Sequence, residues 1–531
     1  MNKIKDTATE RYFMETGQDK AIRLKYHSGG QWLESKTDTY MDCFNPSTGE
    51  VIAQAPQCTS EEVEQIIETA VEAYEEWSIT PVNKRVQVLF RMKNLIDQHL
   101  EELTYLAAKE MGKAWQEAMG DVLKVNEVVE FAAGAPHLMK GESLMQVSKG
   151  YDTVQYHHPI GVFAGIAPWN FPAMIPHGWM APICIATGNC MILKAASFVP
   201  QSSLRLMELW QEAGLPDGVL NVFTAGRKQA EILLTHPDIK GVSFVGSTKV
   251  GKHIYSTAAA HGKRVQALTE AKNHALVLRD CKIERTARGI INAFCGCAGQ
   301  RCMALPTIVV ENAIADELVD CLKQFAVEHQ KFLGPAYEKT SHMGPVVNQG
   351  HMDFVLDWIE TGVNEGAELV LDGRNPEVPA GCEKGYFIGP TIFDHVTEDM
   401  SVGREEIFGP VLCVKRVENF EEGLTSMNNS RFANGSVIYT QNGYYAREFA
   451  HRTDGGMVGI NVGIPVPVGI FGFTGHKQSF FGDLHTMGRD GFIFFTETKN
   501  VTQTWFSESE LSTGKVDTWD GTITSLPEDD K

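Results

Sequence analysis

The fold of this chain is decided by four short apolar runs: GVFAGIA at 161–167, CMILK at 190–194, GVLNVF at 218–223 and GVSFV at 241–245. Helical patterns at 200–213 and 227–235 lie between the later runs. Short apolar strands that alternate with helices are typical of a parallel, doubly wound α/β sheet. A second α/β series follows from about residue 275, so the same architecture is predicted to continue.

The region upstream of these runs is predicted to be helical. Thr59 and Glu62 have the spacing of a capping box. Apolar residues then recur at helical spacing, namely Val63, Ile66, Ile67, Ala70, Val71, Tyr74 and Trp77. Residues 84–108 and 115–132 also have helical patterns, whereas 152–157 alternates like a strand.

The composition indicates a globular protein, since 43% of its 531 residues are hydrophobic and 21% are charged. Lys and Arg total 47 against 67 Asp and Glu, which gives a formal net charge of -20. A chain this acidic repels nucleic acids and anionic membranes, so neither is expected as a partner. An anionic ligand needs a local basic pocket or a helix N-terminus.

The cysteines and the N-terminus indicate a reduced, cytoplasmic enzyme. Eleven cysteines show no paired framework, and the N-terminus has no apolar signal core. Residues 160–193 carry no Asp, Glu, Lys or Arg, yet they include four prolines. Prolines at that density exclude a lipid-exposed helix, so this stretch is predicted to be strand, turn and helix beside a site.

The first chemical motif is the turn that begins at Gly246 and Ser247. It follows an apolar run and opens a helical pattern with G-x-x-x-x-G spacing. A glycine there lets the backbone approach a phosphate, and the helix N-terminus offers free N–H groups. A plain strand-to-helix turn is the alternative.

The second motif surrounds Cys302, in GQRCMA at 299–304. The neighbouring cation Arg301 is expected to favour the thiolate, which is the nucleophilic form of the thiol. The alternative is a buried packing cysteine. Cys295 and Cys297 lie close by, but without a well-spaced histidine this is a poor zinc pattern, so no metal site is predicted.

Three further residues suit a ligand site. Asn170, within PWNFP at 168–172, has a side-chain amide that could stabilise an oxyanion beside a thiol. Lys194 lies at the carboxyl end of a predicted strand, where α/β sheets bind ligands. Glu406, within EEIFGP at 405–410, could hold a ribose. For Asn170 and Glu406, an ordinary structural turn is the alternative.

The order of these motifs along the chain resembles the aldehyde dehydrogenase superfamily. Its closest resemblance is to the CoA-acylating methylmalonate/malonate semialdehyde dehydrogenases. The narrower resemblance rests on GIAP at 165–168, FPAMIP at 171–176, HGKRVQ at 261–266, AKNH at 271–274, AGQRCMA at 298–304, and PVP at 465–467 with FTG at 473–475.

The resemblance implies NAD(P)-dependent oxidation of a small carboxylated aldehyde through a thioester on Cys302. Asn170 and the backbone N–H of Cys302 would form the oxyanion hole, and CoA would take the acyl group with loss of CO2. The implied cofactor-binding residues are Ile166, Ala167, Pro168, Trp169, Lys194, Ser197, Gly246, Ser247, Glu406 and Phe408.

The chain departs from this pattern at the base that activates water. Hydrolytic members carry a glutamate where this chain has Leu268, which favours CoA over water as acyl acceptor. Glu270 lies two residues away, and in an extended segment it would face the same side. The alternative function is therefore a CoA-independent hydrolytic aldehyde dehydrogenase with Glu270 as its base.

Two other departures concern specificity. Lys124 stands where close relatives have an arginine for the substrate carboxylate; it keeps the charge but loses the bidentate geometry. Arg301 matches a second carboxylate-binding arginine. Ser197 replaces an acid that grips the adenosine 2′-hydroxyl, which predicts relaxed NAD/NADP selectivity.

The resemblance also implies two doubly wound parallel α/β domains with a small β arm. The NAD-binding domain would comprise 20–139 and 159–272, and the catalytic domain 273–470. The oligomerisation arm would comprise 140–158 and 486–502, with a polar C-terminal tail at 503–531. The apolar run at 491–495 is expected to be a strand of this arm, in a homodimer or homotetramer.

Overall fold

The strands predicted between 161 and 245 lie in the middle of an eight-stranded sheet in the computed structural model, which describes residues 13–14, 21–148, 150–505 and 507–508. Its order is β23-β13-β12-β9-β10-β11-β3-β4. The bounds are β3 (Tyr26–Ser28), β4 (Gln31–Leu33), β9 (Val162–Ile166), β10 (Cys190–Lys194), β11 (Leu220–Phe223), β12 (Ile239–Val245), β13 (Arg264–Leu268) and β23 (Phe480–Gly482). The strands from β13 to β11 are parallel, which confirms the predicted α/β class.

The helices around this sheet fall into two groups, and the helices within each group contact one another. The group of α1 (Ser60–Trp77), α8 (Arg227–Thr235) and α9 (Thr248–Ala260) packs on the sheet. The other group contains α2 (Val82–Gln98), α6 (Ala181–Thr187) and α7 (Gln201–Glu212), with α3 (Leu100–Met111), α4 (Trp115–Ala132) and the π-helical turn η1 (Ile175–Met180) packed around it. The short helix α5 (Ala135–Leu138) follows α4.

The helix predictions upstream of the sheet are confirmed. The Thr59–Glu62 capping box is present at the start of α1. The helical segment 84–108 comprises α2 and α3, which are divided at His99, where φ is -103° and ψ is 14°.

The second α/β series forms a seven-stranded sheet of order β16-β17-β18-β15-β14-β20-β21. Its strands are β14 (His274–Val277), β15 (Thr307–Glu311), β16 (Glu368–Leu371), β17 (Thr391–Asp394), β18 (Val411–Val417), β20 (Gly435–Tyr439) and β21 (Met457–Ile460). Its helices are α10 (Ile283–Cys295), α11 (Asn312–Gln330), α12 (Gln349–Asn364), α13 (Phe420–Asn428) and α14 (Gly443–Arg452). All strand pairs are parallel except β16 with β17.

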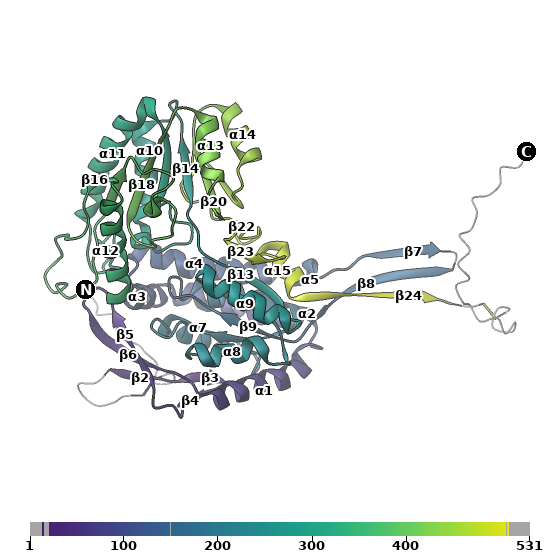
Figure 1. Ribbon diagram of the computed structural model, residues 1–531. Coiled ribbons are helices and arrows are strands. Elements are labelled where there is room, and N and C mark those ends of the chain that lie inside the picture. Colours follow the sequence, from purple (N-terminus) through teal and green to yellow (C-terminus); the bar gives the residue numbers. More distant parts are fainter. Residues whose placement is uncertain (1–12, 15–20, 149, 506, 509–531) are drawn as a thin grey trace, which may run out of the picture. The chain divides into compact units, whose positions relative to one another are not determined.

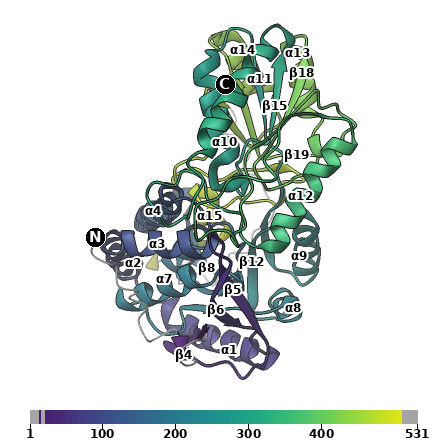
Figure 2. The ribbon, with the colours of Figure 1, turned by 90° about the vertical axis from the view of Figure 1, so that its left-hand side faces the viewer.

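Successive residues of these strands enter two separate cores. Ala275 and Val277 belong to the core that includes α10 and α11, whereas Leu276 belongs to the core beneath α13 and α14. This alternation places helices on both faces of the sheet. Figures 1 and 2 show the two sheets as separate lobes, with α10–α14 in the upper lobe and α1, α7, α8 and α9 in the lower one.

The two large sheets belong to one compact unit of the chain. This unit also contains two smaller sheets and two short turns. The four-stranded sheet has the order β1-β2-β6-β5, and β19 pairs with β22. Their bounds are β1 (Phe13–Met14), β2 (Ile22–Leu24), β5 (Tyr40–Asn45), β6 (Glu50–Pro56), β19 (Phe432–Ala433) and β22 (His476–Lys477). The turns are η2 (Gly296–Gly299) and η3 (Ser401–Gly403).

A second compact unit comprises residues 139–158 and the described residues from Thr498 onward. Its three-stranded sheet has the order β24-β8-β7, with β7 (Ser143–Ser148), β8 (Tyr151–Pro159) and β24 (Thr496–Thr504). Gln155 Nε2 donates to Asn500 Oδ1 at 3.2 Å between two of these strands. Of the predicted tail, residues 509–531 lie outside the described part of the chain.

The apolar run at 491–495 is not a strand, so that expectation was wrong. It lies in helix α15 (Gly488–Phe494). Phe492 packs against Phe131, and Phe494 packs against Phe163, with ring centroids 5.6 Å apart in both pairs. Burial of these aromatic rings against the main core overrides the β propensity of the sequence.

Among the helices of the described residues, none is both long and apolar enough to cross a membrane.

Candidate active site

Three segments expected to hold a dinucleotide meet at the carboxyl ends of neighbouring strands. Residues 166–169 end and follow β9, Lys194 ends β10, and Gly246 follows β12. Strand β9 lies between β10 and β12, so the chain order reverses direction at this point of the sheet. Open α/β sheets bind ligands at such switch points.

The turn at Gly246 and Ser247 fits a pyrophosphate. Ser247 is the exposed N-cap residue of α9, and the helical hydrogen bonds begin with Gly251 N–H to Ser247 O. The backbone N–H groups of the first turn therefore have no acceptor within the helix. A Cβ on Gly246 would lie 2.5 Å from the Phe244 ring, so any larger residue at this position would have to displace that ring.

Lys194 and Ser197 lie on the adjacent strand end. Burial lowers the pKa of Lys194 to about 8, so a hydrogen-bonding ligand would stabilise its charged form. Ser197 is buried, and its hydroxyl donates to Gln57 Oε1 at 3.4 Å. These polar groups suit the adenosine end of a dinucleotide.

Glu406 and Phe408 reach this edge from the other lobe. Glu406 Oε1 accepts the N–H of Ala271 at 2.9 Å, just after β13. The Phe408 ring lies 5.4 Å from the Trp169 ring, edge to face. His351 Nε2 donates to the carbonyl of Phe408. The backbone of Phe408 has a φ of 58°, which is unusual for a bulky residue. The structure thus brings the expected cofactor residues of both lobes together.

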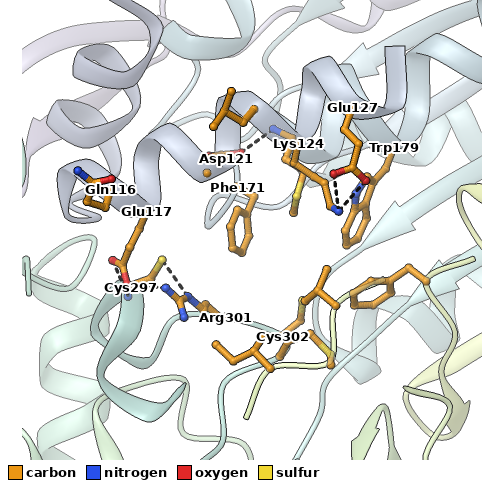
Figure 3. A pocket seen from close by; sticks show the side chains of 17 residues that line it. Gln116, Glu117, Asp121, Lys124, Glu127, Phe171, Trp179, Cys297, Arg301 and Cys302 are labelled. Carbon is orange, nitrogen blue, oxygen red and sulfur yellow. Dashed lines mark hydrogen bonds and ion pairs between the residues drawn. The ribbon is translucent and has the colours of Figure 1, made fainter. Parts of the chain in front are cut away.

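Cys302 lies on a cavity of about 450 Å³ that Lys124 and Arg301 also line. Figure 3 shows helix α4 along one side and the loop from Cys297 to Cys302 along the other. Cys302 is partly exposed, so the sulfur is not sealed in apolar packing. The apolar part of the lining consists of Leu123, Phe171, Met174, Trp179, Met303, Ile464, Val466 and Phe473.

The loop that carries Cys302 begins with a left-handed turn. Cys297 and Ala298 have φ of 50° and 51°, a conformation that costs roughly 1–2 kcal/mol per residue for side chains of this chirality. A Cβ on Gly299 would lie 2.0 Å from the carbonyl oxygen of Gly409. The carbonyl of Cys302 accepts the amides of Asn273 at 2.9 Å and Asn434 at 3.1 Å. These contacts fix the main chain at the nucleophile.

The thiol of Cys302 is neutral in this resting state. Burial raises its pKa to about 12, and the carboxylate of Glu406 adds to the increase. Arg301 lowers the pKa of Cys302, as expected, but burial has the larger effect. The guanidinium of Arg301 also bonds the Glu117 carboxylate and Cys297 Sγ.

Asn170 lies beside the same loop. It is buried, and its Nδ2 donates to the carbonyl of Gln300 at 3.1 Å. A side-chain amide has two N–H groups, so one remains for an oxyanion. Asn170 is outside the set of residues that line the cavity.

Both candidate substrate-binding cations have glutamate partners on α4. Lys124 Nζ lies 2.9 Å from Glu127 Oε1 and donates to the Pro467 carbonyl at 2.8 Å. Arg301 pairs with Glu117. Any substrate carboxylate would compete with these partners.

Glu270 lies away from the cavity lining, near Glu406. It is half-buried, and its charge contributes to raising the pKa of Glu406 to about 8, although burial is the main cause. Leu268 is buried at the end of β13. Its side chain offers no general base at that position.

The sequence analysis missed three residues that shape the site: Glu117, Asn273 and Asn434. Glu117 lies seven residues before Lys124 on a predicted helix, so it shares the same face, and this spacing could have revealed it. Asn273 lies within AKNH, which was noticed only as part of the resemblance. Asn434 follows β19 and had no sequence signal.

The comparisons with known proteins show the family of the chain. The profile of the aldehyde dehydrogenase family matches residues 32–501, and the chain belongs to that family. It is therefore an oxidoreductase that acts on aldehydes.

Several relatives share most of the chain. It is 47% identical over 482 residues to malonate-semialdehyde dehydrogenase 2 of Geobacillus kaustophilus (strain HTA426), covering 91% of this chain and 99% of that protein. The crystal structure of methylmalonate-semialdehyde dehydrogenase from Oceanimonas doudoroffii has a TM-score of 0.89 and 42% identity, with 91% and 99% of the two chains covered. A structure described as a methylmalonate-semialdehyde dehydrogenase of Sinorhizobium meliloti 1021, complexed with NAD, has a TM-score of 0.90 and 39% identity, with 92% and 99% covered.

Proposed function

We propose that this protein oxidises a small carboxylated aldehyde of the malonate or methylmalonate semialdehyde type and passes the acyl group to CoA with loss of CO2. The observation that carries the proposal is one cavity that holds both Cys302 and two cations, Lys124 and Arg301. The names of the relatives support the substrate class.

Cys302 is the proposed nucleophile. Its thiol loses a proton to solvent water, the sulfur attacks the aldehyde carbon, and the C=O π electrons move to the oxygen, which becomes an oxyanion. The free N–H of Asn170 and the backbone N–H of Cys302 would stabilise that charge. Lys124 and Arg301 would orient the substrate carboxylate.

NAD is the proposed cofactor, and when bound it supplies the hydride acceptor that leaves a thioester on Cys302. Gly246 and Ser247 would bind its pyrophosphate. Lys194 and Glu406 would bind the riboses, while Ile166, Ala167, Pro168, Trp169 and Phe408 would flank the cofactor. Ser197 carries no charge to repel a 2′-phosphate, so NADP is proposed to be accepted as well.

CoA is the proposed acyl acceptor because Leu268 cannot activate water. The thiol of CoA attacks the thioester carbonyl, and Cys302 leaves as its thiol. A 3-oxo acid group in the substrate would lose its carboxylate as CO2. Hydrolysis, with Glu270 as base, is the competing outcome of the test.

The test measures products with malonate semialdehyde and NAD, with and without CoA. We expect acetyl-CoA and at least tenfold faster steady-state NADH formation with CoA. Cys302→Ala should abolish NADH formation. Equal turnover without CoA, with free acid as product, would establish hydrolysis, and Glu270→Gln would then have to remove it.

A homodimer or homotetramer is proposed to form through the small β unit. Several large apolar side chains are exposed there, among them Leu144, Met145 and Trp505 at 61%, 76% and 82%. Light scattering of the intact protein and of a Leu144→Glu/Met145→Glu variant tests this assembly; a monomeric wild type would refute it. The cytoplasm is the proposed compartment, which the eleven free cysteines support.

A further inference from the structure

The carboxylate of Glu117 joins the two sides of the cavity. Glu117 lies in the first turn of α4 and lines the cavity with Arg301 and Cys302. Both of its oxygens accept the backbone N–H of Cys297 at 2.8 Å. The same carboxylate pairs with the guanidinium of Arg301. Glu117 therefore holds the loop at two points, one on the main chain and one on a side chain.

These two points bracket the turn that precedes the nucleophile. Cys297 and Ala298 are both left-handed, and such conformations persist only where surrounding contacts impose them. Arg301 closes the turn, because its Nε donates to Cys297 Sγ at 3.3 Å. The guanidinium lies directly over Gly296, where an added Cβ would be 2.3 Å from Nη1.

The far side of the loop has its own supports. Gly299 packs on the backbone of Gly409, and Asn273 and Asn434 hold the Cys302 carbonyl. Glu117 provides the support on the near side. Its removal would free the Cys297 N–H and the Arg301 guanidinium together.

We propose that Glu117 is a positioning residue that sets the orientation of Cys302 toward the aldehyde. The proposal rests on the proposed function of Cys302 as nucleophile. A displacement of the attacking atom by about 1 Å can lower a rate about 100-fold. Loss of Glu117 should therefore reduce the rate of the chemical step and leave substrate binding much less affected.

Two variants separate the contacts. Glu117→Ala removes both of them. Glu117→Gln keeps an oxygen that can accept the Cys297 N–H, but it loses the charge that pairs with Arg301. If Glu117→Gln has nearly the wild-type rate while Glu117→Ala does not, the hydrogen bond to the Cys297 N–H is the contact that matters.

Glu311 provides a matched control. Its carboxylate accepts the backbone N–H of Arg279 at 2.8 Å and the Nε of the same arginine at 2.6 Å. It therefore has the same pair of partner types, at the end of β15 and outside the cavity lining. Glu311→Ala should keep the catalytic rate within threefold of wild type.

The experiment measures single-turnover NADH formation with the full-length enzyme in excess over malonate semialdehyde. We expect a rate about 100-fold lower for Glu117→Ala and within fivefold of wild type for Glu117→Gln, with the enzyme concentration at half-maximal rate changed less than threefold. The iodoacetamide labelling rate of Cys302, followed by peptide mass spectrometry, should change for Glu117→Ala and not for Glu311→Ala.

The outcomes distinguish the two proposals. A Glu117→Ala enzyme with a lower unfolding midpoint but a wild-type single-turnover rate would overturn the positioning role. If Glu117→Ala fails to fold, Glu117→Gln decides. A 100-fold loss of its single-turnover rate, together with unchanged labelling of Cys302, would also overturn the positioning role. NADH formation by Cys302→Ala would instead refute the proposed function itself.

Discussion

At the scale of single residues, the protonated form of the thiol of Cys302, the proposed nucleophile, is favoured. Burial is the main reason, and Glu406, which belongs to the same lobe as Cys302, reinforces it. Glu406 is itself shifted, since burial raises its pKa to about 8. The charge near the thiol therefore changes within the working range of pH.

Glu406→Gln tests this electrostatic link. Above pH 8, Glu406 is mostly ionised and disfavours the thiolate, so the glutamine variant should label faster with iodoacetamide. We expect a severalfold increase at pH 9 without cofactor, measured by mass spectrometry of the Cys302 peptide. Glu405→Gln, which removes the neighbouring partner of Arg431, is the control. Equal labelling of all three proteins would contradict the link.

Ser197 provides a second test at this scale, for cofactor choice. Wild type should show less than a hundredfold preference for NAD in kcat/KM, because no carboxylate at this position opposes a 2′-phosphate. Ser197→Glu should lower kcat/KM for NADP at least tenfold, since two like charges about 4 Å apart repel by several kcal/mol at an effective dielectric constant of 20. Ser197→Gln has a similar size without charge and serves as the control. A hundredfold or greater preference for NAD in wild type would contradict relaxed selectivity.

At the scale of elements, α4 supports the loops around the cavity. Asp121 accepts the N–H of Met174 at 2.7 Å and pairs with Lys113 at 3.0 Å, and both charged side chains are fully buried. Lys113 Nζ also lies 3.7 Å from the centre of the Phe171 ring. The segment after Asn170 is thus attached to α4 through the Asp121 carboxylate, whose charge is paired with that of Lys113.

Lys113→Met tests how strongly that attachment depends on charge. Removing one partner of a buried pair leaves the other charge unpaired, which typically costs 3–5 kcal/mol. We expect a loss of about that size in the free energy of unfolding by urea. Lys93→Met breaks the more exposed pair with Asp97 and should cost less than about 1 kcal/mol. Similar losses in both variants would contradict the role of burial.

At the scale of the whole molecule, the fold was largely predictable because each short apolar run is followed by helical spacing. The strand predictions at 190–194 and 218–223 match β10 and β11 closely. The helix at 491–495 was not predictable, since its burial depends on Phe131 and Phe163, which are far away in the sequence.

The site was predictable where chemistry depends on residue type and order. Cys302 could be found from its motif and Lys124 from the resemblance to the family, and both line the cavity. The state of the thiol was not predictable, because it depends on the burial that the fold imposes and on Arg301 being engaged by Glu117. Such pairings across more than a hundred residues leave no local pattern.

Acid should destabilise the whole protein through its buried histidines. Burial lowers the pKa of His27 to about 4 and of His177 and His274 to about 3. Between pH 6.5 and 4 the unfolded chain binds protons that the folded chain does not, so stability falls as pH falls. Each histidine contributes up to about 1.4 kcal/mol per pH unit.

Urea unfolding between pH 5 and 7 tests this expectation. His177→Gln should reduce the slope of the unfolding free energy against pH by up to about 1.4 kcal/mol per pH unit, which is the contribution of one histidine. His451→Gln replaces an exposed histidine and serves as the control. The same slope in wild type and His177→Gln would contradict the contribution of His177.

The raised pKa of the Cys302 thiol has a consequence for the lifetime of the enzyme. Peroxide reacts with thiolates far faster than with thiols, and the first product, a sulfenic acid, can proceed to irreversible forms. A resting enzyme whose reactive cysteine stays protonated is therefore slow to be inactivated by oxidants. The same burial that delays ionisation protects the catalyst between turnovers.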